Sequence, residues 1–359
     1  MSSQQNNANR NMSEEKERQR NRTIDKEAQR ANLVKSGNRF ITKFISAISD
    51  DQHLPKEQKD KYIQRLLHAI FFIGYVNDPS VSPMEFLSNI NNLWEVIKKK
   101  YPEPCEKYLT HLPRQTPYSI LLEYMGRNMP SNDTELMKKL VTFNTSLLQL
   151  GHENQEALMA NDFSFAASVI ACSKYDDKKT SISTYGASLS CKGKDLRKLM
   201  IAISTLHVWH KAISYVVCCG NRGDRIEFYN HFYCNAFNVA YNINAQKYMY
   251  IPVSPCKLCH KMYKNVTFCP GFDNKNASWA YGNCGETESF SKLLLRLEDS
   301  KNYHLFTVIN SKEKSLNGLD IEDTFNKEHK KPMTDYVNNI LKQRKFNFDP
   351  KDWQLFSPV

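Results

Sequence analysis

Glycine is scarce in this chain, with 12 among 359 residues, and the glycines do not cluster. The phosphate loop of P-loop NTPases and the dinucleotide-binding fingerprint both need closely spaced glycines, so neither class fits. The Gly-x-Ser-x-Gly motif of α/β-hydrolases and the His-Glu-x-x-His motif of zinc proteases are missing too. These absences exclude several common nucleotide-binding and hydrolytic sites.

Long apolar runs are also missing. The longest, from Leu66 to Val76, is interrupted by His68 and is far shorter than the roughly 20 residues of a membrane-spanning helix. Residues 1–30 are polar and charged, without the apolar core of a secretory signal. We therefore expect no membrane contact and a cytoplasmic or nuclear location, where the ten cysteines are free thiols or metal ligands rather than disulfides.

The composition does contain the material for a large core, because 41% of the residues are apolar and there are 19 Phe and 18 Tyr. The net charge is +11. A positive surface favours anionic partners, such as nucleotides or nucleic acid, although no dense stripe of Lys and Arg is present.

The residue pattern divides the chain into three parts. Residues 1–36 are polar and charged, so we expect a disordered tail with at most transient helix. Residues 37–190 show apolar positions at helical spacing, which predicts a helical domain that offers a surface for a protein partner. Its predicted helices are at 40–48, 62–71, 118–126, 133–150 and 154–159, and another helix is predicted at 194–209.

Residues 191–359 mix both periods and predict a second domain with a mixed sheet, so the fold class is α+β or α/β. Two strands, at 212–219 and 225–229, are predicted to form a hairpin around a turn at Asn221–Asp224. Further strands are predicted at 247–253 and 303–309, and helices at 231–242, 255–264 and 283–298.

A Pro-Cys-x-x-Cys motif, Pro255 to Cys259, lies between a predicted strand and a predicted helix. Cysteines three residues apart place both sulfurs on one face of the first helical turn. The unpaired N–H groups of a helix N-terminus stabilise thiolates, and thiolates bind zinc. The sequence therefore favours Cys256 and Cys259 as metal ligands.

A second motif, Cys284-Gly285-Glu286, opens the next predicted helix. Cys284 would be a third ligand. Glu286, two residues on, would lie beside the metal without binding it, where it could move the proton of a metal-bound water. Three protein ligands and one open position are typical of a catalytic zinc site.

Together these motifs resemble those of the cytidine-deaminase-like superfamily, over residues 195–310. The resemblance implies a mixed sheet flanked by helices, with zinc held by Cys256, Cys259 and Cys284 and with Glu286 as general acid/base. It further implies that a zinc-bound hydroxide attacks a nucleobase, either in a free nucleotide or within nucleic acid. The motif order departs from the family, in which the (His/Cys)-x-Glu helix precedes Pro-Cys-x-x-Cys.

Two other interpretations stay open. His231 precedes Cys256 by about the family's spacing, and as the third ligand it would restore the usual order. Tyr233 would then replace the catalytic Glu, and a Tyr with a pKa of about 10 cannot be the base at neutral pH, so this would be an inactive relative. Alternatively, Cys269 or His260 closes a four-ligand structural zinc site in a non-enzymatic binding module.

Overall fold

The computed structural model describes residues 2–358 except for some short segments. The segments outside the description are 89–91, 128–132, 149–164, 192, 230, 243–246, 274–275, 298–302, 310–311, 317 and 347–353. The helix predicted at 154–159 lies outside the described residues. Over the described part the chain has both helices and two mixed sheets, which confirms the predicted α+β class.

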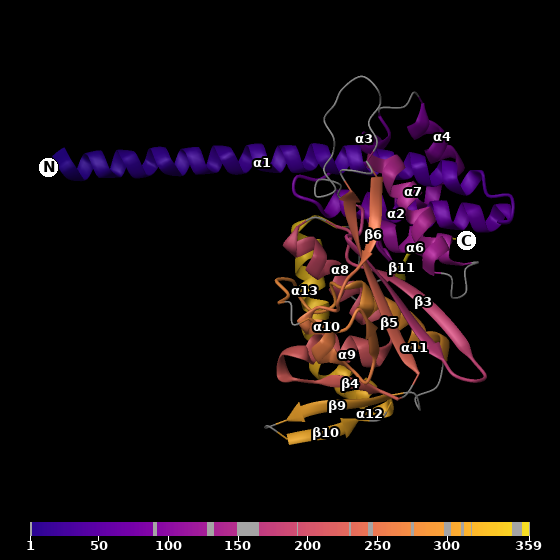
Figure 1. The fold of residues 1–359 in the computed structure, drawn as a ribbon. Helices are drawn as coiled ribbons and strands as arrows, with labels where there is room; N and C mark the ends of the chain where they lie inside the picture. The colour runs from indigo at the N-terminus through magenta and orange to yellow at the C-terminus, as the bar shows by residue number, and fades with distance from the viewer. Residues whose placement is uncertain are drawn as a thin grey trace.

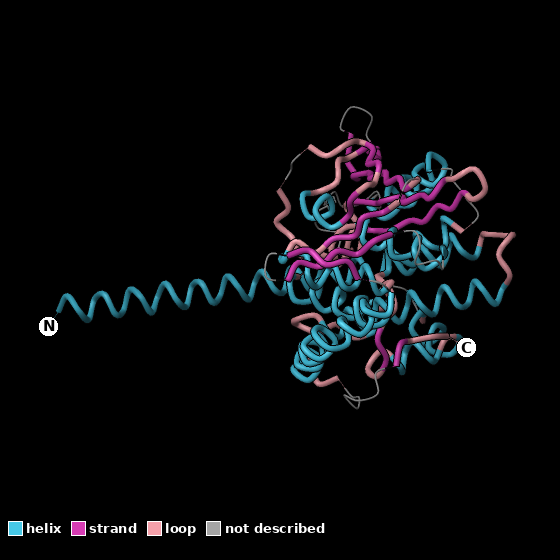
Figure 2. Tube along the Cα trace, turned by 90° about the horizontal axis from the view of Figure 1, so that it is seen from below, coloured by secondary structure: helices cyan, strands magenta, loops and turns pink. Residues whose placement is uncertain are grey.

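The chain begins with one long helix, α1 (Ser2–Ser49), whose first turns project away from the body of the protein (Figure 1, Figure 2). This differs from the disordered tail expected over residues 1–36. Part of the reason is tertiary: Leu33 is buried, and Arg30 forms an ion pair with Glu85. The predicted apolar face further along the helix is buried, at Phe40, Phe44 and Ile48.

Helices are present where they were predicted at 62–71 and 118–126 and, as far as residue 148, at 133–150. The helices after α1 are α2 (Lys56–Val76), α3 (Pro83–Leu87), α4 (Leu93–Lys100), α5 (Pro102–Lys107), α6 (Pro117–Gly126) and α7 (Asp133–Leu148). Two of them begin with side-chain caps. Ser82 and Glu85 form a reciprocal capping box at α3, and Thr116 accepts a hydrogen bond from the backbone of Ser119 at α6. The cap at Thr116 fixes the start of α6, which forms part of the site described below.

The larger sheet has the order β3-β2-β5-β6, with β8 also paired to β5. Its strands are β2 (Val169–Asp176), β3 (Ser181–Ala187), β5 (Phe232–Asn242), β6 (Lys247–Pro252) and β8 (Thr267–Cys269). The helix predicted at 231–242 is therefore wrong. Phe232, Cys234 and Ala236 are buried while the residues between them are not, which is the alternation of a strand. The β2–β3 hairpin was not predicted at all.

The smaller sheet has the order β10-β9-β4-β7. Its strands are β4 (Arg225–Phe228), β7 (Tyr263–Lys264), β9 (Tyr303–Ile309) and β10 (Lys312–Leu316). The strand predicted at 212–219 is wrong, because these residues form α9 (Lys211–Cys219). The His210 side chain caps this helix, with Nδ1 accepting from the backbone N of Ala212 at 3.3 Å. A short apolar run that is buried on nearly all sides has no periodicity to separate helix from strand.

The remaining helices of this half agree in place with the predictions where these were made. They are α8 (Lys194–His207), α10 (Lys257–Met262), α11 (Gly285–Leu297), α12 (Gly318–Phe325) and α13 (Lys331–Gln343), the last preceded by a π-helical turn at Asn326–Lys330. No helix in the described part of the chain is long and apolar enough to cross a membrane.

Helix α11 lies between the two sheets. On one side it contacts β2 and β3 of the larger sheet. On the other side, the Phe290 ring packs against Phe228 of β4 and Tyr263 of β7, with ring centroids 5.0 and 4.8 Å apart. This central position explains why the first two turns of α11, from Gly285 to Ser291, are all buried.

The C-terminal end of the chain returns to the helical half. Strand β11 (Gln354–Leu355) pairs in parallel with β1 (His111–Leu112), and Phe356 stacks on His68 of α2 with ring centroids 4.0 Å apart. The first strand of the larger sheet, β2, begins at Val169, which is before the predicted start of the sheet-containing domain at residue 191. The boundaries at 37–190 and 191–359 stay a prediction.

The buried His68 should make stability depend on pH. Burial lowers the pKa of His68 from 6.5 to about 3, so the unfolded chain takes up its proton first as pH falls. The stabilisation is thus complete above pH 6.5 and is lost progressively below it. Between pH 7 and 5 we expect wild type to lose about 2 kcal/mol more unfolding free energy than His68→Phe, which keeps the ring stack. Denaturant unfolding at several pH values checks this, and equal losses in both proteins would contradict it.

Candidate metal centre and adjoining cavity

Three cysteines converge at the start of α11. The sulfurs of Cys256, Cys259 and Cys284 all lie within 4.8 Å of one another, and those of Cys256 and Cys284 are 3.5 Å apart. Three thiolates at about 2.3 Å from a tetrahedral zinc would have their sulfurs about 3.8 Å apart, so the donor set and its spacing fit such an ion. The fold thus joins the two motifs despite their reversed order, and the cluster could hold a metal ion.

The local fold explains how these sulfurs meet. Cys256 directly precedes α10, Cys259 lies in its first turn, and Cys284 directly precedes α11. The loop before Cys284 turns at Gly282, whose φ of 86° is in the left-handed region. A side chain at Gly282 would also place its Cβ 3.2 Å from the Trp209 ring. Glycine at this position therefore permits both the turn and the close packing.

Two glycines let α11 lie directly on β3. A Cβ built at Gly186 would come within 2.2 Å of the Gly285 carbonyl oxygen and 2.4 Å of the Ser289 nitrogen. A Cβ at Gly285 would come within 2.8 Å of the Gly186 carbonyl oxygen. Backbone therefore packs on backbone here, which sets the height of α11 and hence the positions of Cys284 and Glu286.

Glu286 lies in the first turn of α11 and is 3% exposed. The Cys259 side chain lies within interaction distance of its carboxyl, which places Glu286 beside the sulfur cluster. Burial raises the pKa of Glu286 to about 7. Among the described residues the close group consists of the three sulfurs, so the carboxyl lies next to the candidate metal position without joining it.

The three thiols differ in their pKa values. Hydrogen bonds from the Cys259 and Cys284 thiols lower the pKa of Cys256 to about 3, and backbone N–H groups of the first turn of α10 add to this. The hydrogen bond to Cys256 raises the pKa of Cys259, and that of Cys284 is raised as well. Trp279 donates its indole N–H to the Cys284 sulfur at 2.9 Å. This lowered pKa favours the thiolate form of Cys256, and the thiolate is the form that binds a metal ion.

The other ligands considered from the sequence are not brought to the sulfurs. Within the part of the chain that the structure describes, the group that could hold a metal comprises the three cysteines and no further side chain. His260 instead stacks on Phe272 with ring centroids 3.9 Å apart, and Cys269 is exposed. The His231 ring lies 6.4 Å from the ring of Tyr175. Tyr175 belongs to β2, the strand that pairs with the start of β5.

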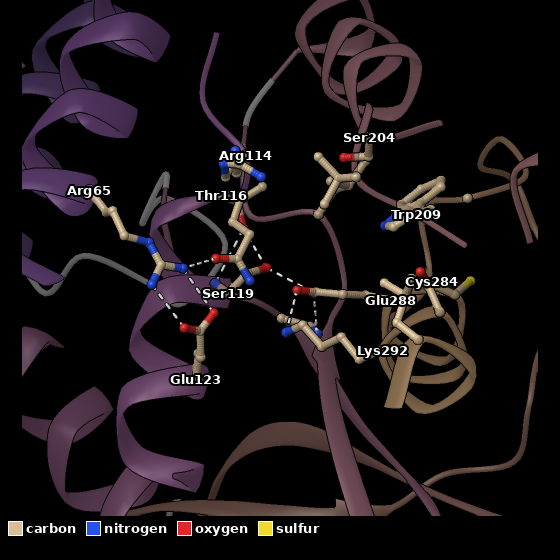
Figure 3. A pocket seen from close by; sticks show the side chains of 17 residues that line it. Arg65, Arg114, Thr116, Ser119, Glu123, Ser204, Trp209, Cys284, Glu288 and Lys292 are labelled. Atoms are coloured by element: carbon tan, nitrogen blue, oxygen red, sulfur yellow. Dashed lines mark hydrogen bonds and ion pairs between the residues drawn. The ribbon is translucent and has the colours of Figure 1, made fainter. Parts of the chain in front are cut away.

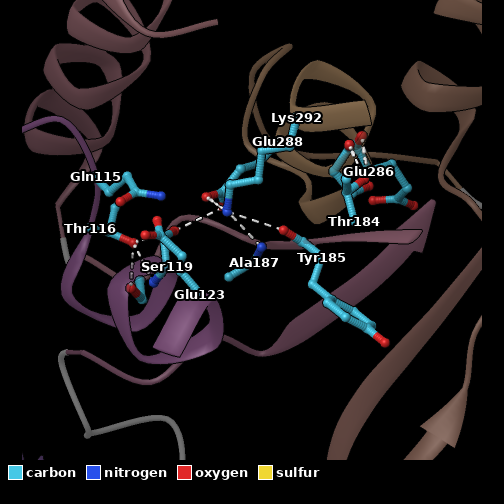
Figure 4. Close-up of polar contacts among 12 residues, drawn as sticks. Gln115, Thr116, Ser119, Glu123, Thr184, Tyr185, Ala187, Glu286, Glu288 and Lys292 are labelled. Atoms are coloured by element: carbon cyan, nitrogen blue, oxygen red, sulfur yellow. Dashed lines mark hydrogen bonds and ion pairs between the residues drawn. The ribbon is translucent and has the colours of Figure 1, made fainter. Parts of the chain in front are cut away.

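Beyond Glu286, α11 carries several buried polar side chains, and each has a partner. Figure 4 shows the largest group, centred on Glu288. Its carboxylate accepts hydrogen bonds from Ser119 Oγ at 2.8 Å and from the backbone N of Ala187 at 2.9 Å, and it pairs with Lys292 at 2.7 Å. Glu288 thus ties together α6 of the helical half, β3 and α11, where an apolar contact would be expected in an ordinary core.

A cavity of about 260 Å³ adjoins the cluster (Figure 3). It lies between the start of α6, the end of β3, the end of α8 and one side of α11, and Cys284 and Gly282 form part of its wall. The residues of the helical half that line it are Arg65, Arg114, Gln115, Thr116, Ser119 and Glu123. None of these was predicted from the sequence, because they lie more than 130 residues from the cysteine motifs and carry no motif of their own.

No known protein family matches the chain, and no curated protein or solved structure matches it either. The resemblance to the cytidine-deaminase-like superfamily therefore rests on the two motifs, and it stays a prediction.

Proposed function

We propose that this protein is a zinc-dependent hydrolytic deaminase that acts on a nucleobase, either free as a nucleotide or within nucleic acid. The observation that carries the proposal is the buried carboxyl of Glu286 beside a three-cysteine cluster. Among the described residues the cluster has no fourth protein ligand. An open position on the metal is what distinguishes catalytic zinc sites from structural ones.

Each residue then has a definite role. Cys256, Cys259 and Cys284 would hold the ion, and a bound zinc would act as a Lewis acid that lowers the pKa of water toward neutrality. Glu286 would accept a proton from the attacking water and deliver it to the departing amine, so that C–NH₂ and H₂O become C=O and NH₃. The cavity beside Cys284 would admit the base, and the net charge of +11 favours an anionic substrate.

Metal analysis is the first test. Purified wild type should contain about one zinc ion per chain, and Cys256→Ser or Cys284→Ser should lose it because two thiolates bind zinc far more weakly than three. His231→Ala and Cys269→Ser are matched controls that should keep the metal. Elemental analysis of all five proteins measures this. Metal-free wild type after purification in zinc, or zinc retained by Cys284→Ser, would overturn the proposal.

A structural zinc in a non-enzymatic binding module is the second candidate. It is favoured by the burial of Cys256 and Cys259 and by the slight exposure of Glu286. Under this alternative the metal only links α10 to α11, and its removal unfolds the C-terminal half. A screen of cytosine, adenine and guanine compounds, with ammonia release as readout, separates the two candidates. Turnover that is lost when zinc is removed would show that the site is catalytic.

A further inference from the structure

The cavity has walls from both halves of the chain, which is typical of a ligand site rather than of a packing defect. Its lining includes hydroxyl groups and charged side chains as well as Trp209 and Leu189. Most of its wall is apolar with a few placed polar groups, which is the usual character of a small-molecule pocket. The polar groups that can bind a ligand are those without a partner in the folded protein.

The charges around the cavity do not cancel. Arg65 pairs with Glu123 through two contacts of 2.8 and 2.9 Å, and Lys292 pairs with Glu288 at 2.7 Å. These four residues are mutually neutralised. Arg114 also lines the cavity, is exposed, and makes no hydrogen bond or ion pair with any residue that the structure describes. One positive charge is thus left over, and it belongs to a side chain that can bind a phosphate or carboxylate through two N–H groups.

On the wall of the cavity opposite the helical half, Trp209 supplies a hydrogen-bond donor that has no protein acceptor among the described residues. The residue is 9% exposed and lines the same cavity. Its indole N–H has no hydrogen-bond acceptor among the described residues, and Figure 3 shows the nitrogen on the side of the ring that faces the cavity. The nitrogen is open to the cavity rather than fully buried, so it can donate to a ligand that enters there.

From these groups we infer that the cavity binds a small organic anion, with its phosphate or carboxylate held by Arg114 and its planar, acceptor-bearing part against Trp209. Arg114 lies in the segment before α6 and Trp209 in the segment after α8, while Cys284 borders the same cavity. A ligand between the two would reach the cysteine cluster. The inference rests on the proposed function only in taking this anion to be the substrate; the binding itself needs no metal.

Titration calorimetry on the full chain tests the inference with three probes: cytidine 5′-monophosphate, orotate and cytidine. They share a pyrimidine ring and carry a phosphate, a carboxylate and no charge, respectively. Wild type should bind one of the two anions roughly ten- to a hundredfold more tightly than cytidine, because hydrogen bonds to a charged group are worth more than neutral ones. Whichever anion binds more tightly identifies the headgroup.

The variants locate the contact. Arg114→Gln should remove the preference for the anion and leave cytidine binding within about twofold, while Arg114→Lys should restore part of it. Trp209→Phe should weaken all three probes by about threefold or more, through the lost N–H. Arg197→Gln removes another exposed arginine, which does not line the cavity, and should change nothing. Thermal melting confirms that each variant is folded.

Equal binding of the three probes, no binding, or an anion preference that survives Arg114→Gln would overturn the inference. Repeating the titration on Cys284→Ser separates the test of anion binding from the test of the proposed deaminase activity. Anion binding that persists in this variant while neither protein deaminates any base would support the ligand site and sink the deaminase. Deamination of cytidine without preferential binding of either anion would support the deaminase and overturn the anion site.

Discussion

The Glu286→Gln variant is expected to keep its zinc and its fold but to lose deamination by about a hundred- to ten-thousandfold. Gln has nearly the same volume as Glu, so the tight packing around this 3%-exposed side chain should persist. Gln cannot take a proton from water, whereas a carboxyl beside the metal can. The loss should therefore appear in kcat, with little change in KM or in metal content.

Cys256→Ser is the informative contrast to Glu286→Gln, because it should lose metal and turnover together. Elemental analysis, melting temperature and ammonia release, measured on the same preparations, give the needed comparison. A Glu286→Gln protein that deaminates as fast as wild type would remove the carboxyl from the mechanism. A variant that loses its zinc would instead make Glu286 a structural support of the cluster.

The cysteine site was predictable because its information is local. Both motifs are short, both lie at predicted helix starts, and the chemistry of thiolates at helix N-termini applies to each separately. Their convergence was not local information, since it depends on the first turns of α10 and α11 meeting in the folded protein. The reversed motif order made that meeting doubtful from the sequence, yet the sulfurs of Cys256 and Cys284 lie 3.5 Å apart.

The errors in the fold prediction have a common physical cause. Residues 212–219 are buried nearly throughout, whereas buried and less buried residues alternate at the start of 231–242. In both segments tertiary contacts override local propensity. Strand β5 pairs with β2, β6 and β8. Its pairing with β2 places it in the middle of the sheet, and β2 was not predicted. With the β2–β3 hairpin missing from the prediction, the alternation of Phe232, Cys234 and Ala236 had no partner strand to support it.

The cavity was unpredictable for a different reason. Arg114 and Glu288 come from opposite halves of the chain and belong to no recognisable motif. Their importance depends on which charges near them are neutralised, and that is a property of the folded protein. Arg65, for example, looks like any helix-surface arginine until its pairing with Glu123 leaves Arg114 as the unpaired charge.

Gly186→Ala is expected to destabilise the protein by about 3 kcal/mol and to lower its zinc content. Local propensity alone predicts the opposite sign, since replacing Gly in a strand by Ala usually stabilises it by about 0.5–1 kcal/mol. Packing should win because the new Cβ would lie 2.2 Å from the Gly285 carbonyl oxygen and 2.4 Å from the Ser289 nitrogen. Neither is the flexible end of a side chain, so α11 itself must move.

Movement of α11 should reach the metal centre directly, because Gly285 lies between Cys284 and Glu286. Gly271→Ala is the matched control: its Cβ would meet nothing within 4 Å, so stability and zinc content should match wild type. Denaturant unfolding and elemental analysis of both variants test this. If Gly186→Ala is as stable as wild type and fully loaded, backbone contact with β3 does not position α11, and the loop at Gly282 must hold Cys284 in place by itself. If stability falls while zinc content is unchanged, the cluster is rigid enough to move with the helix, and the sheet contributes to folding but not to metal binding.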